Sequence, residues 1–491
     1  MLVHLRPHST CAGVFLLCIG FDLAPRSPYH VTVIRVAYHS LGCKVNQYEG
    51  EKIREALESA GCVTVAFGSM ADAYVINTCS VTSAADGKSR AAVRRALRAN
   101  PQAFVVVAGC YAELAPDEIR AIEGVDIVVP NAEKEQIAER IVAHFAGLSQ
   151  AESSGPQTRG GGLRAVPRLR TRAVVKVQDG CDQFCSYCIV PHARNRMLSR
   201  ALDDVLAEIR MLAGFGYREI VLTGIRLGSY GRGREQRAEG GEWGRGGEQR
   251  AESGEQGREG SGLAGLVRQV CEVEGVERIR LSSIEPWEVD DALLDAMESP
   301  KVCRHLHIPL QSGDDGVLDR MNRPYTAQRY REIVARVRSR IPGIGITTDV
   351  IAGFPGESDE AFANTRALIE EVGFSRLHMF RYSVRKRTPA ASMPDQVPVE
   401  VRKARADNLT ELGITAMRRF ASSLVGETLE VLAERQAKLP NHLVGFTDNY
   451  VETVFPGDVE IKGQVVRVSI IGVDQDGVLG VRRPVTGNGG G

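Results

Sequence analysis

Strand-like and helix-like runs alternate along two long stretches of this chain, and that alternation limits the folds it can adopt. The runs expected in residues 31–148 are, in chain order, 33–39, 47–60, 73–77, 83–99, 104–108, 126–129 and 133–145. Short apolar runs separated by amphipathic segments indicate parallel strands with helices packed on the sheet. We therefore expect an open α/β domain at the N-terminal end.

The second stretch, residues 172–414, contains six further strand–helix units. Its expected strands are 173–177, 219–222, 278–281, 306–309, 345–350 and 377–380. Six such units are typical of a partial (βα)6, TIM-like barrel, whose chemistry lies at the carboxyl ends of the strands. From about residue 415 to 483 short runs separated by Gly and Pro predict a small all-β barrel, with strands at 428–433, 450–454, 458–461 and 464–471.

Four segments fall outside these patterns. Residues 1–30 are expected to be a non-structural extension. The apolar run that they contain, from Cys11 to Phe21, is too short to span a membrane. Residues 149–171 are rich in Ser, Gly, Pro and Arg and indicate a linker. Residues 231–262 contain a tandem repeat and almost no apolar side chain, which predicts a disordered insertion, and 484–491 predict a flexible tail.

Three cysteines, Cys181, Cys185 and Cys188, follow the first expected barrel strand with the spacing CxxxCxxC. Thiolates are the usual ligands of iron–sulfur clusters, and three of them leave one iron of a four-iron cubane without a protein ligand. This spacing is typical of radical S-adenosylmethionine (SAM) enzymes. A zinc site would need a fourth ligand, and only His192 is close in sequence; three unrelated core thiols are the other alternative.

Three more cysteines, Cys43, Cys79 and Cys110, each follow an expected strand of the first domain. Because the carboxyl ends of parallel strands share one edge of a sheet, we expect these thiols to converge on a second three-thiolate site. The alternative is three buried core thiols. The remaining cysteines have no partner spacing and are expected to be structural or incidental: Cys11, Cys18, Cys62, Cys271 and Cys303.

The total of 11 cysteines is odd and suits a reducing cytoplasm better than a disulfide framework. Lys plus Arg and Asp plus Glu both number 61, so the net charge indicates no polyanionic partner. Basic residues nevertheless cluster at 164–200, 320–340 and 381–405, where they could neutralise phosphates. Three histidines on expected barrel strands, His305, His307 and His378, are expected to be packed or hydrogen-bonded.

Taken together, these motifs resemble the methylthiotransferases, a branch of the radical SAM superfamily, over residues 33–483. The resemblance rests on runs that begin at Leu41 (LGCKVNQYE), Gln178 (QDGCDQFC), Thr223 (TGIRLGSY), Ser282 (SSIEP), Ile308 (IPLQSG) and Thr347 (TTDVIAGFPGE). It implies a catalytic SAM-binding 4Fe-4S cluster on Cys181, Cys185 and Cys188 and an auxiliary 4Fe-4S cluster on Cys43, Cys79 and Cys110. By motif position it further implies SAM contacts from Gly224, Glu285, Gln311 and Gly353, and a C-terminal TRAM barrel that holds RNA.

The first two runs look like those of the subgroup (MtaB type) that methylthiolates C2 of N6-threonylcarbamoyladenosine at position 37 of tRNA, beside the anticodon. The resemblance thus implies the tRNA anticodon stem-loop, a sulfur donor and an electron donor such as flavodoxin or ferredoxin as partners, and no membrane. The alternatives are the subgroup acting on isopentenyladenosine, with a GCQMN-like first motif, and the one acting on a ribosomal-protein aspartate, with GCPKN. A non-catalytic Fe–S RNA-binding protein is a further alternative.

The chain departs from the family pattern at three positions. Asn195 stands where the family usually has Gly, and it would suit that position if the backbone there needs a positive φ. Arg381 and Arg387 stand where Pro and Gly are usual. The insertion after Tyr230 is also atypical and is expected to lie close to the SAM pocket.

Overall fold

The computed structural model describes residues 33–150, 170–232, 234–236, 262–475 and 477–483. The predicted extension 1–30 and tail 484–491 lie outside the described residues, as does most of the predicted linker 149–171. Of the predicted disordered insertion, residues 237–261 also lie outside them, while residues 234–236 form a short strand, β10, that pairs with β8 (Leu198–Arg200). Strand pairing uses backbone groups, so it does not require the apolar side chains that this segment lacks.

The N-terminal sheet has five parallel strands in the order β2-β1-β3-β4-β5. Its strands are β1 Arg35–Ser40, β2 Val63–Val65, β3 Ala73–Thr78, β4 Phe104–Gly109 and β5 Ile127–Val129. Its helices are α1 Lys44–Ser59, α2 Ser83–Ala99, α3 Cys110–Leu114, α4 Pro116–Arg120, the 3-10 helix η1 Asn131–Gln136 and α5 Ile137–Gln150. The predicted open α/β fold is confirmed; β2, α3 and α4, each of five residues or fewer, were not predicted.

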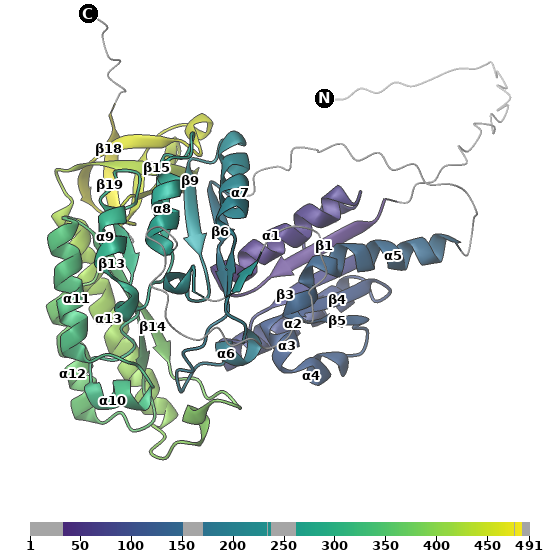
Figure 1. Ribbon diagram of the computed structural model, residues 1–491, viewed down its shortest axis with the longest axis horizontal. Coiled ribbons are helices and arrows are strands. Elements are labelled where there is room, and N and C mark those ends of the chain that lie inside the picture. The colour runs from purple at the N-terminus through teal and green to yellow at the C-terminus, as the bar shows by residue number, and fades with distance from the viewer. Residues whose placement is uncertain (1–32, 151–169, 233, 237–261, 476, 484–491) are drawn as a thin grey trace, which may run out of the picture. The chain divides into compact units, whose positions relative to one another are not determined.

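Side-chain alternation along the strands explains why helices cover both faces of this sheet. Val36 and Val75 pack with α1 and α5, whereas their neighbours Ala37, Tyr74 and Ile76 pack with α2, α3 and α4 (Figure 1). Strands β3 and β4 are buried along their whole length, as expected for parallel strands covered on both sides.

Six parallel strands form the partial barrel, in agreement with the prediction. They are β6 Arg172–Lys176, β9 Glu219–Thr223, β11 Arg278–Leu281, β12 His305–His307, β13 Gly345–Ala352 and β14 Arg376–Arg381. The first three and the last three form separate ladders, and a parallel bridge between Ser283 and His307 connects them. The helices of this part are α6 Val190–Ala193, α7 Leu202–Gly214, α8 Leu263–Cys271, α9 Asp291–Met297, α10 Asp315–Arg320, α11 Ala327–Arg340, α12 Asp359–Val372 and α13 Val399–Ser423.

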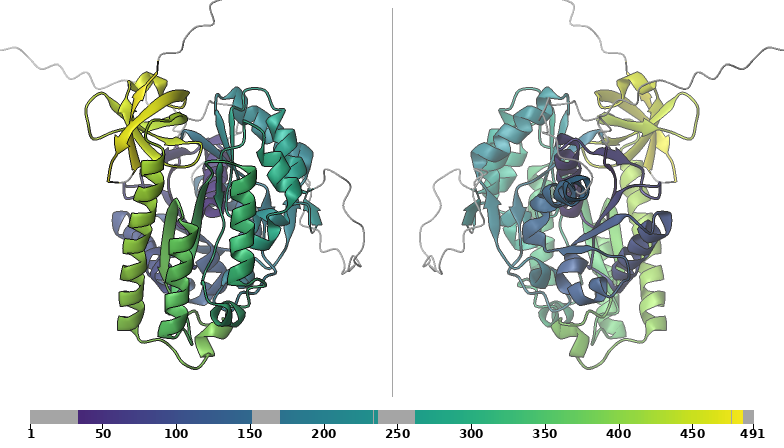
Figure 2. Two further views of the ribbon diagram at one scale, coloured as in Figure 1. Left: turned by 90° about the vertical axis from the view of Figure 1, so that its left-hand side faces the viewer. Right: turned by 90° about the vertical axis from the view of Figure 1, so that its right-hand side faces the viewer.

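A closed antiparallel-rich barrel follows the long helix α13 (Figure 2). Its strands are β15 Thr428–Gln436, β16 His442–Thr447, β17 Glu452–Pro456, β18 Val465–Val473 and β19 Gly477–Arg482. The small all-β barrel was predicted, but residues 458–461 were wrongly expected to be a strand. Residues 459–461 form a 3-10 helix, η5 (Val459–Ile461), with Asp458 as its extended N-cap. Strands β16 and β19 were missed.

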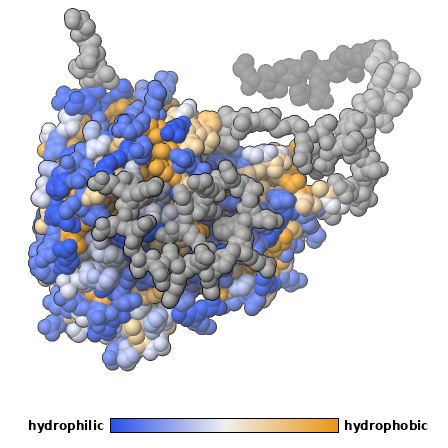
Figure 3. All heavy atoms as spheres, viewed as in Figure 1, coloured by the Kyte–Doolittle hydropathy of each residue, from blue (hydrophilic) through white to orange (hydrophobic). Residues whose placement is uncertain are grey.

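Hydrophilic residues predominate on the face of the molecule shown in Figure 3, with hydrophobic residues scattered among them. Among the described residues, no helix combines the length and the apolar character needed to cross a membrane.

Candidate iron–sulfur and SAM site

The loop carrying Cys181, Cys185 and Cys188 leaves the carboxyl end of β6 through the two-residue strand β7 (Gln178–Asp179). The three thiols are close enough to interact electrostatically. Burial raises the pKa of Cys181 to about 11 and that of Cys188 to about 12. Hydrogen bonds from the backbone N–H groups of Gln183 and Val190 oppose this effect, because each stabilises a thiolate.

Arg323 connects this loop to the segment that follows β11. Its Nη1 donates to Cys185 Sγ at 3.4 Å and to Glu285 Oε1 at 3.3 Å, and its Nη2 forms an ion pair with Glu285 Oε2. The guanidinium also lies over the Trp287 ring, 4.9 Å from its centroid. Sequence reasoning missed Arg323, since one arginine within a basic cluster carries no distinguishing signal.

The four predicted SAM contacts follow strands β9, β11, β12 and β13, at the edge of the barrel from which the cysteine loop also starts. A Cβ on Gly224 would lie 2.8 Å from Gln178 Oε1, and one on Gly353 would lie 2.4 Å from Arg402 Cγ. Close packing therefore explains both glycines without a ligand. Gln311 is buried with a φ of 61°, and Glu285 is the partner of Arg323.

Cys43, Cys79 and Cys110 lie together at the carboxyl edge of the N-terminal sheet. Cys43 is the N-cap of α1, Cys79 follows β3, and Cys110 begins α3 directly after β4. The three thiols interact electrostatically, and burial raises the pKa of Cys79 to about 11 while a hydrogen bond from the Val81 N–H opposes it. A Cβ on Gly42 would lie 2.8 Å from Cys79 Sγ, so only glycine leaves room for that thiol.

Both thiol groups suit iron–sulfur clusters. Each offers three cysteines from loops at strand ends, with N–H donors directed at sulfur, and such donors are among the features that tune cluster chemistry. Among the described residues, no group of three or more His, Cys, Asp or Glu side chains is arranged to hold a single metal ion. The other described cysteines are structural, as predicted: Cys62 and Cys303 are buried, and Cys271 Sγ contacts Ser299 Oγ at 3.4 Å. Cys11 and Cys18 lie outside the described residues.

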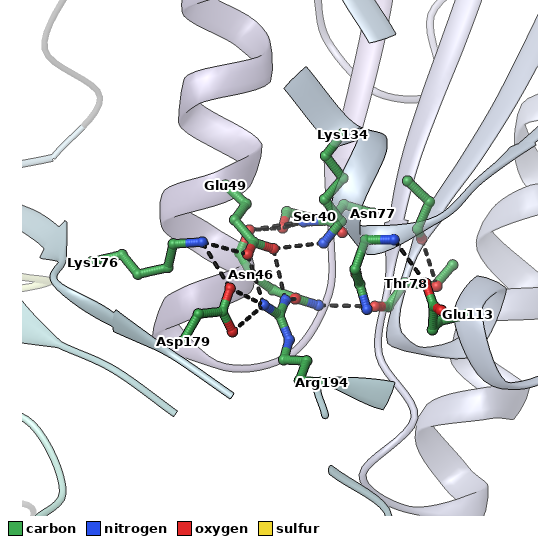
Figure 4. Close-up of polar contacts among 12 residues, drawn as sticks. Ser40, Asn46, Glu49, Asn77, Thr78, Glu113, Lys134, Lys176, Asp179 and Arg194 are labelled. Carbon is green, nitrogen blue, oxygen red and sulfur yellow. Dashed lines mark hydrogen bonds and ion pairs between the residues drawn. The ribbon is translucent and has the colours of Figure 1, made fainter. Parts of the chain in front are cut away.

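A buried ion-pair network joins the two thiol-bearing parts of the chain (Figure 4). Arg194 donates to Glu49 at 2.7 Å and to Asp179 at 2.8 Å. Lys176 lies 3.1 Å from Glu49 and 2.9 Å from Asp179, and Lys134 lies 2.5 Å from Glu49. Although burial alone would raise the pKa of Glu49, these three cations hold it well below its usual value. Glu49 lies on the helix that Cys43 caps, and Asp179 lies just before Cys181, so the network fixes one loop relative to the other.

A second contact links the Cys79 loop to the barrel. Arg385, in the loop after β14, donates to Asp86 at 2.5 Å and to Ser80 at 2.7 Å. Ser83, at the start of α2, donates through its hydroxyl to the carbonyl of Val384 at 3.1 Å. Polar contacts between the N-terminal domain and the partial barrel thus include Asp179, two residues before Cys181, and Ser80, directly after Cys79.

These pairs change the interpretation of the basic clusters. In residues 170–200, four cations have acidic partners inside the protein: Arg172, Lys176, Arg194 and Arg200. Arg329, Arg331 and Arg340 of the second cluster also form ion pairs, although these lie at the surface. Many of the clustered cations thus have acidic partners within the protein, while Arg381, Lys386 and Arg387 are exposed.

Two departures from the family pattern have different structural consequences. Asn195 does not adopt a positive φ, so the conformational reason for a glycine there does not apply. Arg387 does adopt a positive φ, of 80°.

The histidine prediction is confirmed for two residues: His305 Nε2 lies 3.0 Å from Thr347 Oγ1, and His307 Nδ1 lies 2.9 Å from the same hydroxyl. Burial lowers the pKa of His378.

Comparisons with known proteins identify the family of this chain. Residues 35–130 match the profile described as uncharacterized protein family UPF0004, and residues 175–369 match the radical SAM superfamily. The chain is 40% identical over 449 residues to the threonylcarbamoyladenosine tRNA methylthiotransferase MtaB of Bacillus subtilis, covering 89% of this chain and 93% of that protein. The chain belongs to the radical SAM methylthiotransferase family. SAM and two 4Fe-4S clusters, the cofactors predicted from the sequence, are those of this family.

Other relatives place this methylthiotransferase among tRNA-modifying proteins. The MtaB protein of Thermotoga maritima is 36% identical, with 91% of this chain and 96% of that protein covered. The tRNA-2-methylthio-N(6)-dimethylallyladenosine synthase of Novosphingobium aromaticivorans is 34% identical, with 90% and 96% covered. A solved structure that matches this chain is that of the radical S-adenosylmethionine methyltransferase TsrM from Kitasatospora setae, with a TM-score of 0.51 and 15% identity. The match covers 73% of this chain and 77% of that one, and at this identity it shows a similar fold and nothing more.

Proposed function

We propose that this protein adds a methylthio group to C2 of N6-threonylcarbamoyladenosine at position 37 of tRNA. The observation that carries the proposal is the pair of cysteine triads in a chain 40% identical to a named threonylcarbamoyladenosine methylthiotransferase. The Arg194 and Arg385 contacts connect the segments that carry the two triads. The hydrogen at C2 is not acidic, so general acid–base groups alone could not remove it, and the reaction depends on cofactors.

In this proposal the two triads have different roles. Cys181, Cys185 and Cys188 would hold the SAM-binding cluster, with SAM contacts from Gly224, Glu285, Gln311 and Gly353, and Cys43, Cys79 and Cys110 would hold the auxiliary cluster. When bound, these groups supply radical chemistry at C2 and the transferred sulfur. The chain's own residues orient them: Arg323 fixes Glu285 beside Cys185, and the Glu49 network fixes the Cys43 helix relative to the Cys181 loop.

The domain roles and partners follow from the same proposal. Residues 31–148 form the Fe–S domain, 172–414 the radical SAM domain and 415–483 a TRAM-like domain that binds the tRNA anticodon stem-loop. A splayed loop nucleotide is accessible to the enzyme, as is usual when proteins recognise single-stranded RNA. A sulfur donor and an electron donor such as flavodoxin or ferredoxin complete the reaction, which takes place in the cytoplasm, where thiols stay reduced.

Nucleoside mass spectrometry tests the proposal. Anaerobically reconstituted enzyme is incubated with SAM, reductant, sulfide and tRNA that carries both threonylcarbamoyl and isopentenyl adenosines. A 2-methylthio mass gain on the threonylcarbamoyl nucleoside alone supports the proposal. A gain on the isopentenyl nucleoside alone would assign the sister activity instead. Deoxyadenosine formation with no gain on either nucleoside would contradict a tRNA substrate and favour the ribosomal-protein aspartate.

Single cysteine variants separate the two triads. Cys181→Ala is expected to abolish both SAM cleavage and methylthiolation, whereas Cys43→Ala is expected to retain deoxyadenosine formation and lose methylthiolation. Each variant should lose about half of the bound iron, measured per chain, because each triad holds one of two clusters. Cys62→Ala, which changes a buried cysteine outside both triads, is the matched control and should keep its iron and activity. Full iron content in Cys43→Ala would contradict the assignment of the auxiliary triad.

A further inference from the structure

The loop that follows β14 carries two exposed cations at the tip of a tight turn, residues 385–388. The Thr388 N–H donates to the carbonyl of Arg385 at 3.1 Å, and the Thr388 hydroxyl donates to the same oxygen at 2.8 Å. Arg385 and Thr388 are buried, whereas Lys386 and Arg387 between them are exposed. The base of the 385–388 turn is therefore fixed in the protein, while its two central side chains are accessible to solvent.

Arg387 holds the third position of this turn with a φ of 80°. Glycine is the usual residue at a third position with positive φ, because a side chain there is strained. Strained residues persist where the surrounding structure fixes them, and they are concentrated at sites that bind or react. The guanidinium of Arg387 therefore stands at a position where glycine would be more stable, which requires a reason other than folding.

The exposed cations of this segment have no acidic partner. Residues 372–394 contain five Lys or Arg and no Asp or Glu, so no charge nearby in the sequence neutralises them. Arg385 is paired with Asp86. Among the described residues, the side chains of Arg381, Lys386 and Arg387 form no ion pair and no hydrogen bond. A group of exposed cations without counter-charges favours a polyanionic partner.

The chain connects the 385–388 turn directly to the loop of the first cysteine triad. The N–H of Ala390, two residues after the turn, donates to the carbonyl of Ser186 at 2.9 Å, and Ser186 lies between Cys185 and Cys188. An RNA whose base reaches a cluster on this triad therefore brings its backbone close to the turn. The closed barrel, residues 415–483, has eight Lys or Arg against nine Asp or Glu, so additional phosphate contacts have to come from another part of the chain.

We propose that Lys386 and Arg387 bind phosphates of the tRNA anticodon loop beside the nucleotide that is modified. The inference rests on the proposed function and adds an RNA-binding surface on the radical SAM domain. Such contacts position an RNA without reading its sequence. They also make binding more sensitive to salt, because each neutralised phosphate releases counterions. Arg387 thus provides a phosphate contact at the expense of a favourable backbone conformation.

The test measures RNA binding as a function of salt. Fluorescence anisotropy gives the Kd of the reconstituted full-length enzyme for the anticodon stem-loop at several salt concentrations. We expect Arg387→Gln and Arg387→Gly each to raise Kd by roughly two- to fivefold, as for the loss of an exposed charge pair. Each should also reduce the slope of log K against log salt by about 0.7–0.9, the value for one phosphate. Arg387→Lys should keep the wild-type slope.

The two neutral variants separate charge from conformation, because Arg387→Gln keeps the strained backbone and Arg387→Gly relieves it. Equal losses in both attribute the effect to the charge. Stem-loops that carry threonylcarbamoyl or isopentenyl adenosine should lose affinity equally, since a phosphate contact does not depend on the modified base. Arg210→Gln, which removes an exposed arginine from α7, is the matched control and should keep the wild-type Kd and slope.

Iron content per chain is measured for every variant, so that a lost cluster is not mistaken for a lost contact. An unchanged slope in both Arg387→Gln and Arg387→Gly overturns the inference. A loss of affinity confined to the threonylcarbamoyl stem-loop also overturns it, because that result would assign Arg387 to the base. If the wild-type enzyme binds the stem-loop without methylthiolating it, the proposed function is wrong while the slopes still decide the phosphate contact. If it does not bind the stem-loop, both are wrong.

Discussion

Arg387 is an exposed residue in a backbone conformation that favours glycine, with a φ of 80°. A non-glycine residue in the left-handed region lowers the stability of the folded state by about 1–2 kcal/mol. A glycine lowers stability by about 0.4–1 kcal/mol, because it increases the conformational entropy of the unfolded chain. We therefore expect Arg387→Gly to stabilise the protein by roughly 0.5–1 kcal/mol, seen as a higher urea midpoint for the unfolding of this part of the chain.

Lys386→Gly is the control, because Lys386 is also exposed but has no positive φ. The control should lower the midpoint, since it adds flexibility to the unfolded chain and relieves no strain. A midpoint for Arg387→Gly that falls as far as that of the control would show that Arg387 is not strained.

At the residue scale, the sequence predicted which residues carry the chemistry better than it predicted which side chains contact each other. The triads could be recognised because thiols at a fixed spacing, or directly after strands, are unusual. Arg323 and Arg385 could not, because an arginine's partner lies far away in the sequence: Glu285 for the first and Asp86 for the second. The basic clusters were misleading for the same reason, since charge counts do not reveal which cations are paired inside the fold.

At the scale of elements, α1 carries Cys43 at its N-cap and Glu49 two turns further on. Replacing Glu49 by Gln would leave Arg194, Lys176 and Lys134 with Asp179 as their remaining carboxylate in the network. Removing one partner from a buried ion pair typically costs about 3–5 kcal/mol. We expect Glu49→Gln to lower stability by a comparable amount and to increase hydrogen exchange in the segment 178–194.

Glu55→Gln, on the same helix but with a partly exposed carboxylate paired to Lys52, is the control and should cost less than about 1 kcal/mol. The pH dependence follows from the lowered pKa of Glu49. Its contribution to stability is present above the usual carboxyl pKa and is lost as the pH falls from about 4.5 towards its folded value. Glu49→Gln should remove this part of the acid sensitivity, and an unchanged acid profile would contradict the role of the network.

Helices and strands with a strong hydrophobic periodicity could be predicted from the sequence, and short ones could not. Helix α2 has the predicted bounds, 83–99, and in the structure the Thr82 hydroxyl accepts from the Ala85 N–H and caps its start. Strand β16 was missed because the run from His442 to Thr447 includes Gly445, which usually weakens a strand. Here the carbonyl of Leu432 approaches so closely that a Cβ on Gly445 would lie 2.2 Å from it, which only the tertiary structure reveals.

At the scale of the whole molecule, the closed barrel is attached to the amino-terminal ends of the partial barrel's strands. Arg278 and Arg280 are buried there and donate to carbonyls of Phe446, Thr447 and Asp448. Although burial alone would raise the pKa of Glu219, these two arginines lower it to about 2. Carbonyl groups of the closed barrel thus accept hydrogen bonds from the two guanidinium groups that the Glu219 carboxylate alone could not accept. The two barrels therefore depend on each other for stability.

Gly345 tests this dependence, because it lies where the two barrels touch. A Cβ at this position would lie 2.2 Å from the backbone oxygen of Asn449 and 3.3 Å from Ser375 Oγ. Backbone cannot give way as a side chain can, so Gly345→Ala must displace the 447–450 turn. Overpacking of this kind typically costs about 1–3 kcal/mol. We expect faster hydrogen exchange both in residues 446–450 and around Arg278 and Arg280, together with weaker binding of the anticodon stem-loop.

Gly214→Ala is the matched control, because Gly214 ends helix α7 and has no atom within 4 Å of its added Cβ. That variant should keep the wild-type exchange pattern and RNA affinity, and alanine's helix propensity should stabilise it slightly. If Gly345→Ala increases exchange only in 446–450, the arginines keep their partners and the two barrels do not depend on each other for stability. Parallel changes in both regions would instead show that the contact at Gly345 couples the stability of the two barrels.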